Sequence, residues 1–83
     1  MENTLSLVKD KFKELPNNIE AEQSVIGSIL VTNEIFDEIS IIITSSNLYD
    51  PMHQKIFAAI ENLIYKGMLA NPITLKNYFE TEK

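Results

Sequence analysis

Two Asx-Pro pairs constrain the fold of this chain more than any other feature. Asp50 is followed by Pro51 and Asn71 by Pro72, and apolar residues then recur at helical spacing. An Asx side chain accepts hydrogen bonds from the first turn of a helix, and proline suits the first helical position, where its missing N–H would have no partner. The pairs therefore predict the starts of two helices. The first of them is expected to end at Gly67, because glycine readily adopts the left-handed conformation that closes many helices.

Each of these two helices is predicted to bury one apolar face, since its apolar residues repeat every three or four positions. The helix after Pro72 continues through Leu75 and Phe79 to the charged end "ETEK". Because that helix runs to the last residue, we expect the chain to be part of a longer helical domain. The face of the helix after Pro51 is made of Met52, Ile56, Ala59, Ile60, Leu63 and Ile64.

An earlier helix is predicted from about Asn18 to Val31. Asn17 and Asn18 can each cap its start, and Glu20 stands three residues after Asn17, in the position of a capping box. Carboxylates in the first turn also suit the helix dipole. The expected apolar stripe consists of Ile19, Ile26, Ile29 and Leu30, widened by Ala21 and Val25.

One more helix is predicted after Asn33, which is expected to cap it. Its β-branched run "ISIIIT" would also suit a strand, but a lone strand has no partner here, so a helix is favoured. "TSSN" should end it. The predicted fold class is therefore all-α, a small bundle of about four short helices. The face of this helix comprises Ile35, Ile39, Ile42 and Ile43, with Phe36 beside them.

The size of the chain limits how it can be stabilised. Residues 1–14, which hold Lys9, Lys11 and Lys13, are interpreted as a flexible arm, and residues 15–83 as one helical domain. With no cysteine and one histidine, neither a disulfide nor a structural zinc site can support it. A core of this size rarely contributes more than about 3–5 kcal/mol. We expect support from a partner, a second copy or further chain, although a bundle that is stable alone remains open.

Composition excludes several functional classes. Seven lysines, no arginine and twelve carboxylates give a net charge of −5, which argues against direct binding of nucleic acid. No run of about 18 apolar residues could span a membrane. The N-terminal stretch "MENTLSLVKDKFKELP" has no apolar core of a secretory signal. A cytoplasmic protein is expected.

The glycines do not predict a nucleotide site. Gly27 and Gly67 are forty residues apart, whereas a loop that cradles phosphate needs closely spaced glycines. Gly27 lies in the middle of a predicted helix, with Ser24 and Ser28 as small neighbours. We interpret it as a site of close helix packing and expect Gly27→Leu to damage folding.

Residues with catalytic potential are few. His53 follows Asp50 by three residues, which could suggest an acid–base pair, but no nucleophile or oxyanion site accompanies them. Local packing or hydrogen bonding is expected for His53. The sequence therefore predicts no catalytic, cofactor-binding or metal-binding residue in this chain, and it assigns no partner-binding residue. The carboxylate pairs Glu20/Glu22 and Asp37/Glu38 are expected on solvated helix surface, and the scattered Tyr49, Tyr65 and Tyr78 form no base-stacking platform.

The stretch "LPNNIEAEQSVIGSIL" strongly resembles the opening signature of the N-terminal domain of the bacterial replicative DNA helicase, the DnaB family. "NEIFDEI" is similar to the second helix of that family. "LYDPMHQKIFAAIENLIYKG" and the later "ITL" match further segments in the expected order, over about residues 15–80. Asn71 stands where the family often has aspartate, and both residue types can cap a helix.

The resemblance implies a non-catalytic domain of a larger enzyme. In this family the N-terminal domains form a collar, a trimer of dimers, on a hexameric motor, and the collar binds the C-terminal helical domain of primase and sometimes a helicase loader. ATP and Mg²⁺ are expected in the RecA-like motor domain, which this chain lacks. The chain by itself is expected to be a monomer or weak dimer in the bacterial cytoplasm. The alternative is a stand-alone helical regulatory or loader-like protein that shares only the fold; an enzyme acting alone is a third hypothesis.

Overall fold

A computed structural model of the protein describes residues 18–81. The arm expected over residues 1–14 and the possible cap Asn17 lie outside the described residues. Four α-helices and two 3₁₀ turns follow one another without any strand between residues 18 and 81, so the predicted all-α class is confirmed. The helices are α2 (Ile19–Val31), α3 (Phe36–Ile42), α4 (Pro51–Tyr65) and α5 (Pro72–Thr81), and the turns are η1 (Asn33–Ile35) and η2 (Ser45–Asn47).

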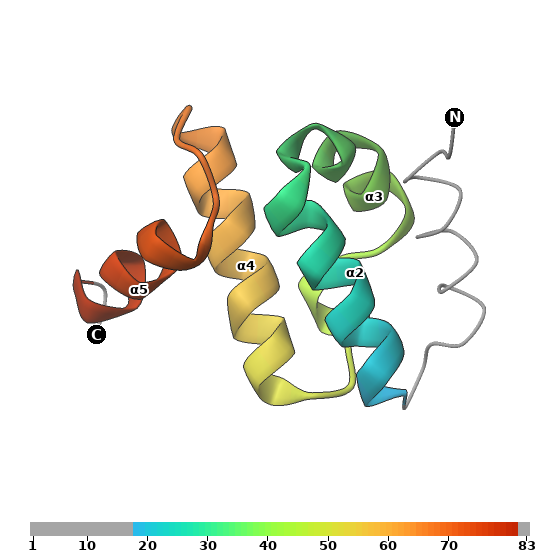
Figure 1. The fold of residues 1–83 in the computed structure, drawn as a ribbon. Coiled ribbons are helices and arrows are strands. Elements are labelled where there is room, and N and C mark those ends of the chain that lie inside the picture. The colour runs from blue at the N-terminus through green and yellow to red at the C-terminus, as the bar shows by residue number, and fades with distance from the viewer. Residues whose placement is uncertain (1–17, 82–83) are drawn as a thin grey trace.

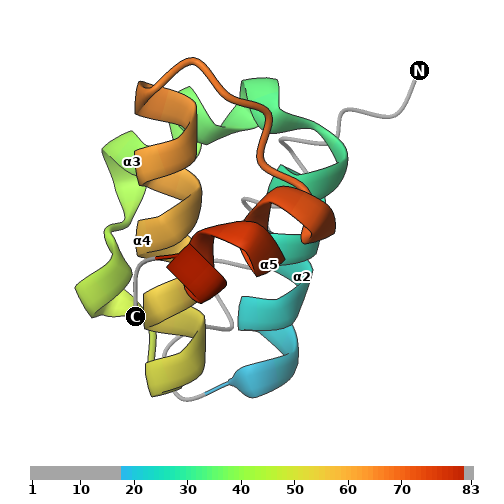
Figure 2. The same ribbon diagram turned by 90° about the vertical axis from the view of Figure 1, so that its left-hand side faces the viewer.

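Helices α2 and α4 lie side by side and start at the same end of the bundle (Figure 1). Figure 1 shows α3 on one side of this pair and α5 on the other. In the second view α5 runs across the front of α4, and the segment that joins them passes over the end of α2 (Figure 2). The starts of α2 and α4 are thus brought together, and so are the end of α2 and the α4–α5 connection.

The core lies between the four helices. Phe36 on α3 and Phe57 on α4 are both fully buried, and their ring centroids are 5.4 Å apart. Such aromatic pairs contribute beyond the area that they bury. The other buried apolar residues are Ala21, Val25, Ile26, Ile29, Ile35, Ile39, Ile43, Leu48, Ala59, Ile60, Leu63, Ala70 and Leu75.

Both Asx-Pro pairs open helices as predicted. The carboxylate of Asp50 accepts a hydrogen bond from the N–H of Met52 at 2.7 Å, at the start of α4. The side chain of Asn71 accepts from the N–H groups of Ile73 and Thr74, each at 2.9 Å. These local signals fixed the starts of α4 and α5 because the caps need only neighbouring residues.

The prediction for the end of α4 is also confirmed. Gly67 has a φ of +79°, and its N–H donates to the carbonyl of Ile64 at 2.9 Å. The N–H of Met68 donates to the carbonyl of Leu63, also at 2.9 Å. This pair of bonds is the Schellman arrangement that ends many helices.

The start of α2 differs in one detail from the sequence prediction. Asn18 caps the helix, because its side chain accepts from the N–H of Ala21 at 3.0 Å. The residue three positions after Asn18 is Ala21, so the capping box expected for Glu20 is wrong. Glu20 is exposed in the first turn, where its charge still suits the helix dipole.

The helix expected after Asn33 is shorter than predicted. Residues Asn33–Ile35 form η1, and α3 begins only at Phe36. The prediction that Asn33 caps this helix is wrong, because its side chain bonds to residues outside it. The predicted face is partly wrong as well: α3 ends at Ile42, which is exposed, and Ile43 reaches the core from extended backbone.

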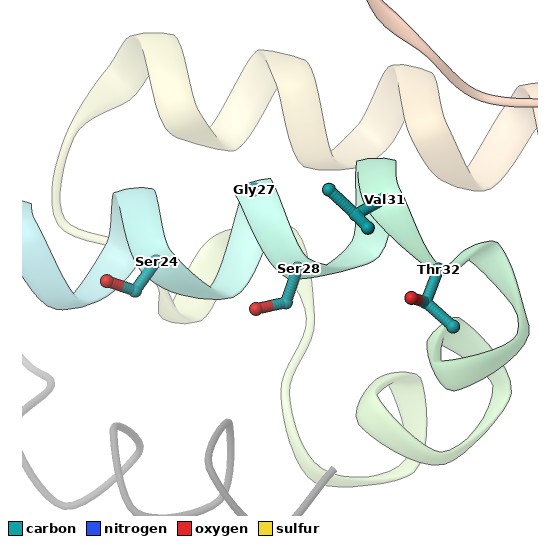
Figure 3. Close-up of a pocket in the computed structure, with 5 residues that line it drawn as sticks. All are labelled: Ser24, Gly27, Ser28, Val31 and Thr32. Atoms are coloured by element: carbon teal, nitrogen blue, oxygen red, sulfur yellow. The ribbon is translucent and has the colours of Figure 1, made fainter. Parts of the chain in front are cut away.

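Among residues 18–81 nothing packs closely on Gly27, so the structure contradicts its interpretation as a site of close helix packing. It is exposed, and within residues 18–81 no atom of another segment comes within 4 Å of where its β-carbon would stand. Figure 3 shows Ser24 and Ser28 on the side of α2 that faces away from α4. These small residues line a shallow surface hollow with Val31 and Thr32. The expectation that Gly27→Leu damages folding has no support in this geometry.

Candidate functional site

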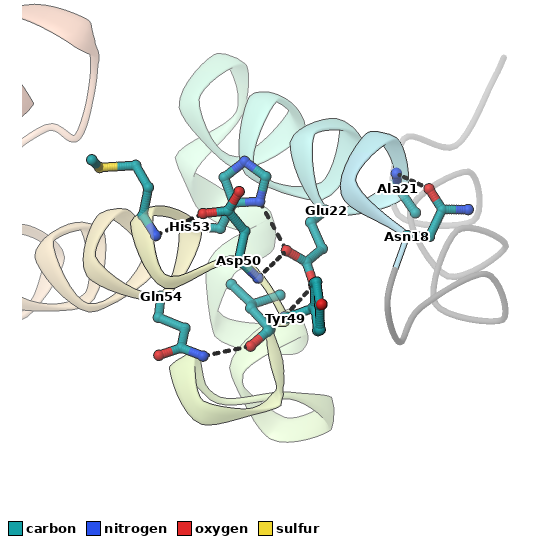
Figure 4. Close-up of polar contacts among 9 residues, drawn as sticks. Asn18, Ala21, Glu22, Tyr49, Asp50, His53 and Gln54 are labelled. Carbon is teal, nitrogen blue, oxygen red and sulfur yellow. Dashed lines mark hydrogen bonds and ion pairs between the residues drawn. The ribbon is translucent and has the colours of Figure 1, made fainter.

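One buried polar cluster joins the starts of α2 and α4. Nδ1 of His53 lies 2.8 Å from Oε1 of Glu22, and the side chain of Glu22 is fully buried (Figure 4). The backbone N–H of Asp50 donates to the same oxygen at 3.2 Å, and the N–H of Tyr49 donates to Oε2. The carboxylate of Glu22 therefore satisfies two backbone groups of the turn before α4 as well as an imidazole.

The electrostatics of Glu22 follow from this setting. Burial by itself would raise the pKa of the carboxyl, because it penalises the charged form. The hydrogen bonds from Tyr49, His53 and Asp50, with the attraction of His53, outweigh burial and hold the pKa below the ordinary glutamate value. Glu22 is thus ionised at neutral pH, and its carboxylate accepts a hydrogen bond from the N–H at Nδ1 of His53.

The prediction that Glu22 lies on solvated surface is wrong. A signal for its burial was present, because Glu22, Val25, Ile26 and Ile29 stand at i, i+3, i+4 and i+7, on one face of the helix. His53, Phe57 and Ile60 show the same spacing on α4. The expectation of a local hydrogen-bonding role for His53 holds only in part, since its partner is 31 residues away.

The other residues singled out in the sequence do not join this cluster. Glu20, Asp37 and Glu38 are exposed, as expected. Tyr49 and Tyr65 are also exposed, whereas Tyr78 accepts a hydrogen bond from Asn62 at 2.8 Å and stacks edge-on against Phe79. Asp50 caps α4 with its side chain and does not pair with His53.

The chemical capacity of the cluster is limited. Glu22 is 0% and His53 8% exposed, so little of either group is open to a substrate. Between residues 18 and 81, no three His, Cys, Asp or Glu side chains come together to hold a metal ion. Among the same residues every buried side-chain polar atom has a hydrogen-bond partner. The cluster therefore fixes α2 against the start of α4.

A second polar contact fixes the opposite end of the bundle. The side-chain amide of Asn33 donates to the carbonyls of Ile29, at 2.8 Å, and Ala70, at 3.0 Å. Its oxygen accepts from the N–H of Ala70 at 2.8 Å. Asn33 thus binds both backbone groups of a residue 37 positions along the chain, and it holds the α4–α5 connection on the end of α2.

The surface carries many apolar side chains. Ten large ones are exposed within the described residues, and several belong to the end of α4, the α4–α5 connection and α5. Single exposed apolar residues are common on protein surfaces, whereas a contiguous group of them often marks a binding site. The ten exposed apolar residues are Val31, Ile41, Ile42, Tyr49, Met52, Tyr65, Met68, Leu69, Ile73 and Phe79.

No helix in the described part of the chain is both long and apolar enough to cross a membrane.

Residues 14–83 match the family model of the DnaB-like helicase N-terminal domain. The chain belongs to this family. Its membership confirms the resemblance that the motifs predicted. In this DnaB-like domain the segment "EAEQ" lies at the start of α2 and "DPMHQ" at the start of α4, so they hold Glu22 and His53 of the first polar cluster.

Curated relatives of this DnaB-like domain are replicative DNA helicases. The replicative DNA helicase DnaB of Rickettsia typhi is 44% identical over 63 residues, which are 76% of this chain and 13% of the relative. The one of Buchnera aphidicola subsp. Baizongia pistaciae is 39% identical over 71 residues, 86% of this chain and 15% of the relative. The one of Pasteurella multocida is 40% identical over 65 residues, which are 78% of this chain and 13% of the relative. The chain thus spans about 13–15% of the length of these relatives, and no solved structure matches it significantly.

Proposed function

We propose that this chain is the non-catalytic N-terminal domain of a hexameric, ATP-dependent replicative DNA helicase. In this proposal it supports assembly of a collar and binds the C-terminal domain of primase or a helicase loader, in the bacterial cytoplasm. The observation that carries the proposal is the family match over residues 14–83, together with relatives that are replicative DNA helicases. ATP and Mg²⁺ would be bound by a separate motor domain.

The distribution of charge supports a role in protein binding over DNA binding. Residues 18–81 contain three lysines and eight carboxylates, which is a net charge of −5 with His53 neutral. A surface of this sign repels phosphate backbones. In the proposed assembly the domain therefore contacts proteins, while other parts of the helicase contact DNA.

The exposed apolar residues support the same role. They leave the surface of a small domain with apolar area that a protein partner could cover. The two polar contacts at opposite ends of the bundle keep the helices in fixed positions. A domain of this kind can present a constant surface to a neighbouring subunit or to primase.

The first test is the reading frame beyond Lys83. A downstream sequence of the form GxxxxGK[ST], the phosphate-binding loop of ATPases, is expected if the parent is a helicase. A stop codon soon after Lys83 would overturn the proposal. That result would favour the stand-alone regulatory or loader-like protein.

The second test addresses the partner. The isotope-labelled chain is titrated with the C-terminal domain of primase from the same organism, and backbone amide shifts are followed by NMR. We expect saturable shifts in a contiguous set of surface residues. If no amide shifts, direct primase binding by this domain is ruled out and only the assembly role is retained.

The third test addresses assembly. The full-length protein is sedimented with and without residues 1–83. Loss of the hexamer is expected on their removal, and an unchanged hexamer would exclude a role in assembly.

A further inference from the structure

The connection between α4 and α5 exposes two large apolar side chains on a backbone that is firmly held. Met68 is 49% and Leu69 63% exposed, whereas the next residue, Ala70, is completely buried. Met68 and Leu69 are therefore exposed although the neighbouring residue Ala70 belongs to the core. The path of the backbone between α4 and α5 directs their side chains to the surface.

Hydrogen bonds hold this loop at both ends. At its start, the N–H groups of Gly67 and Met68 bond to carbonyls of α4. At its end, Asn33 bonds to both the N–H and the carbonyl of Ala70. A backbone held in this way loses little conformational entropy when a ligand covers it, so the positions from which Met68 and Leu69 project are set before binding.

The same loop forms one wall of an open hollow. Ile64, Gly67, Met68 and Leu69 line one side of it, and Asn33, Glu34 and Asp37 line the other. The volume of the hollow is about 390 Å³, enough for one or two large side chains of a partner. Its two walls come from segments about thirty residues apart, which the bonds between Asn33 and Ala70 keep together.

The charge around the hollow has one sign. Glu34 and Asp37 are exposed at its rim, and no lysine is among the residues that line it. Lys66 is close in sequence, but it lines the neighbouring hollow between α4 and α5, which shares Met68 with this one. A hollow with one apolar wall and one wall that carries carboxylates is complementary to a partner segment with apolar side chains on one side and cationic ones beside them.

We propose that this hollow is the docking site for a basic amphipathic helix of a partner protein. One or two apolar side chains of the helix pack on Met68, Leu69 and Ile64, and lysine or arginine side chains pair with Glu34 and Asp37. Lipid headgroups and nucleic acids of negative charge are excluded by the same carboxylates. The inference rests on the proposed partner-binding function, to which it adds a surface and a class of partner.

The test uses the whole chain, isotope-labelled, and a synthetic amphipathic helix of leucine and lysine as the probe. Amides of residues 33–37 and 64–70 are expected to shift on titration, and a helix with glutamate in place of lysine is expected to leave them unchanged. Shifts spread evenly over the chain, or equal shifts with the glutamate helix, would overturn the proposal.

Matched variants distinguish binding at the hollow from nonspecific binding elsewhere on the surface. Met68→Ser is expected to weaken binding of the lysine helix by about tenfold, a loss typical of an interface anchor. Met52→Ser removes a methionine of similar exposure, 58%, at the opposite end of α4 and should have little effect. The double variant Glu34→Gln/Asp37→Asn should weaken binding and reduce its dependence on salt, while Glu20→Gln/Glu80→Gln should not. Equal losses within either matched pair would refute the site.

Two further outcomes identify other occupants. Shifts of the same amides with rising protein concentration and no probe would assign the hollow to a second copy of the chain, against the proposal. If the primase domain binds the wild type and Met68→Ser equally, the hollow is not its docking site, although the proposed function stands. If the primase domain does not bind while the lysine helix binds at the hollow, primase recognition fails and the hollow is retained.

Discussion

Nδ1 of His53 lies 2.8 Å from a carboxylate oxygen of Glu22, 31 residues earlier in the chain, and this contact closes the fold at one end. The same carboxylate accepts the N–H groups of Tyr49 and Asp50, so α2 is bonded to the backbone that leads into α4. A single buried side chain thus provides four acceptor positions for three donors. Its removal would leave all three donors without that partner, and the one at His53 is buried.

Glu22→Ala is expected to lower the free energy of unfolding by about 2–4 kcal/mol, because it breaks the buried pair with His53 and removes the acceptor of two part-buried N–H groups. Urea titration followed by circular dichroism would measure the loss. Glu20→Ala, an exposed neighbour on the same helix, should change stability by no more than about 0.5 kcal/mol. Similar losses for the two variants would show that the buried cluster contributes little.

Acid should destabilise the protein through Glu22. Because its pKa is lower in the folded chain than in the unfolded one, the carboxylate stabilises the fold fully above the ordinary value of 4.5. That contribution is lost as the pH falls through the folded pKa. We expect the melting temperature of the wild type to fall more steeply below pH 4.5 than that of Glu22→Gln. Parallel curves for the two proteins would contradict the assignment.

Asn33→Ala should destabilise the fold and release the α4–α5 connection. It removes the partners of the N–H and carbonyl of Ala70, which is buried, at a cost of about 1–3 kcal/mol. Hydrogen exchange at the amide of Ala70 is expected to accelerate beyond the change in global stability. Asn77→Ala, at an exposed position of α5, is the control and should leave that exchange rate unchanged.

The two glycines should respond in opposite ways to alanine. Gly27 is helical and open to space, so Gly27→Ala should stabilise the protein by up to about 1 kcal/mol. Gly67 has a φ of +79°, where a β-carbon is strained, so Gly67→Ala should destabilise it by about 1 kcal/mol. Thermal unfolding of both variants measures the contrast. A loss of stability in Gly27→Ala would restore a packing role for that residue.

The features that sequence reasoning predicted correctly are those fixed by near neighbours. Asp50-Pro51, Asn71-Pro72 and Gly67 act within one helical turn, so their meaning does not depend on the rest of the fold. The all-α class followed from such signals and from the period of the apolar residues. The family followed from motifs whose order and spacing run along nearly the whole chain.

The features that sequence reasoning did not predict depend on contacts between distant segments of the chain. Asn33 looks like a cap in the sequence, and only the return of the chain at Ala70 gives its amide other partners. The charge of Glu22 favours solvated surface, although its spacing places it on the buried face. The small size of Gly27 indicates close packing only if a neighbouring segment approaches, and none in residues 18–81 does.

The burial of Glu22 also sets the register of one helix against another. Successive residues of an α-helix are rotated by about 100°, so a slip of α2 by a single position would turn this carboxylate out of the cluster. Gln23 or Ala21 would then face the turn before α4, and neither could accept three hydrogen bonds there as a carboxylate does. Apolar side chains tolerate small slips because one hydrophobic contact can replace another. The carboxylate of Glu22 therefore selects one alignment of α2 and α4 from the several that an apolar interface alone would allow.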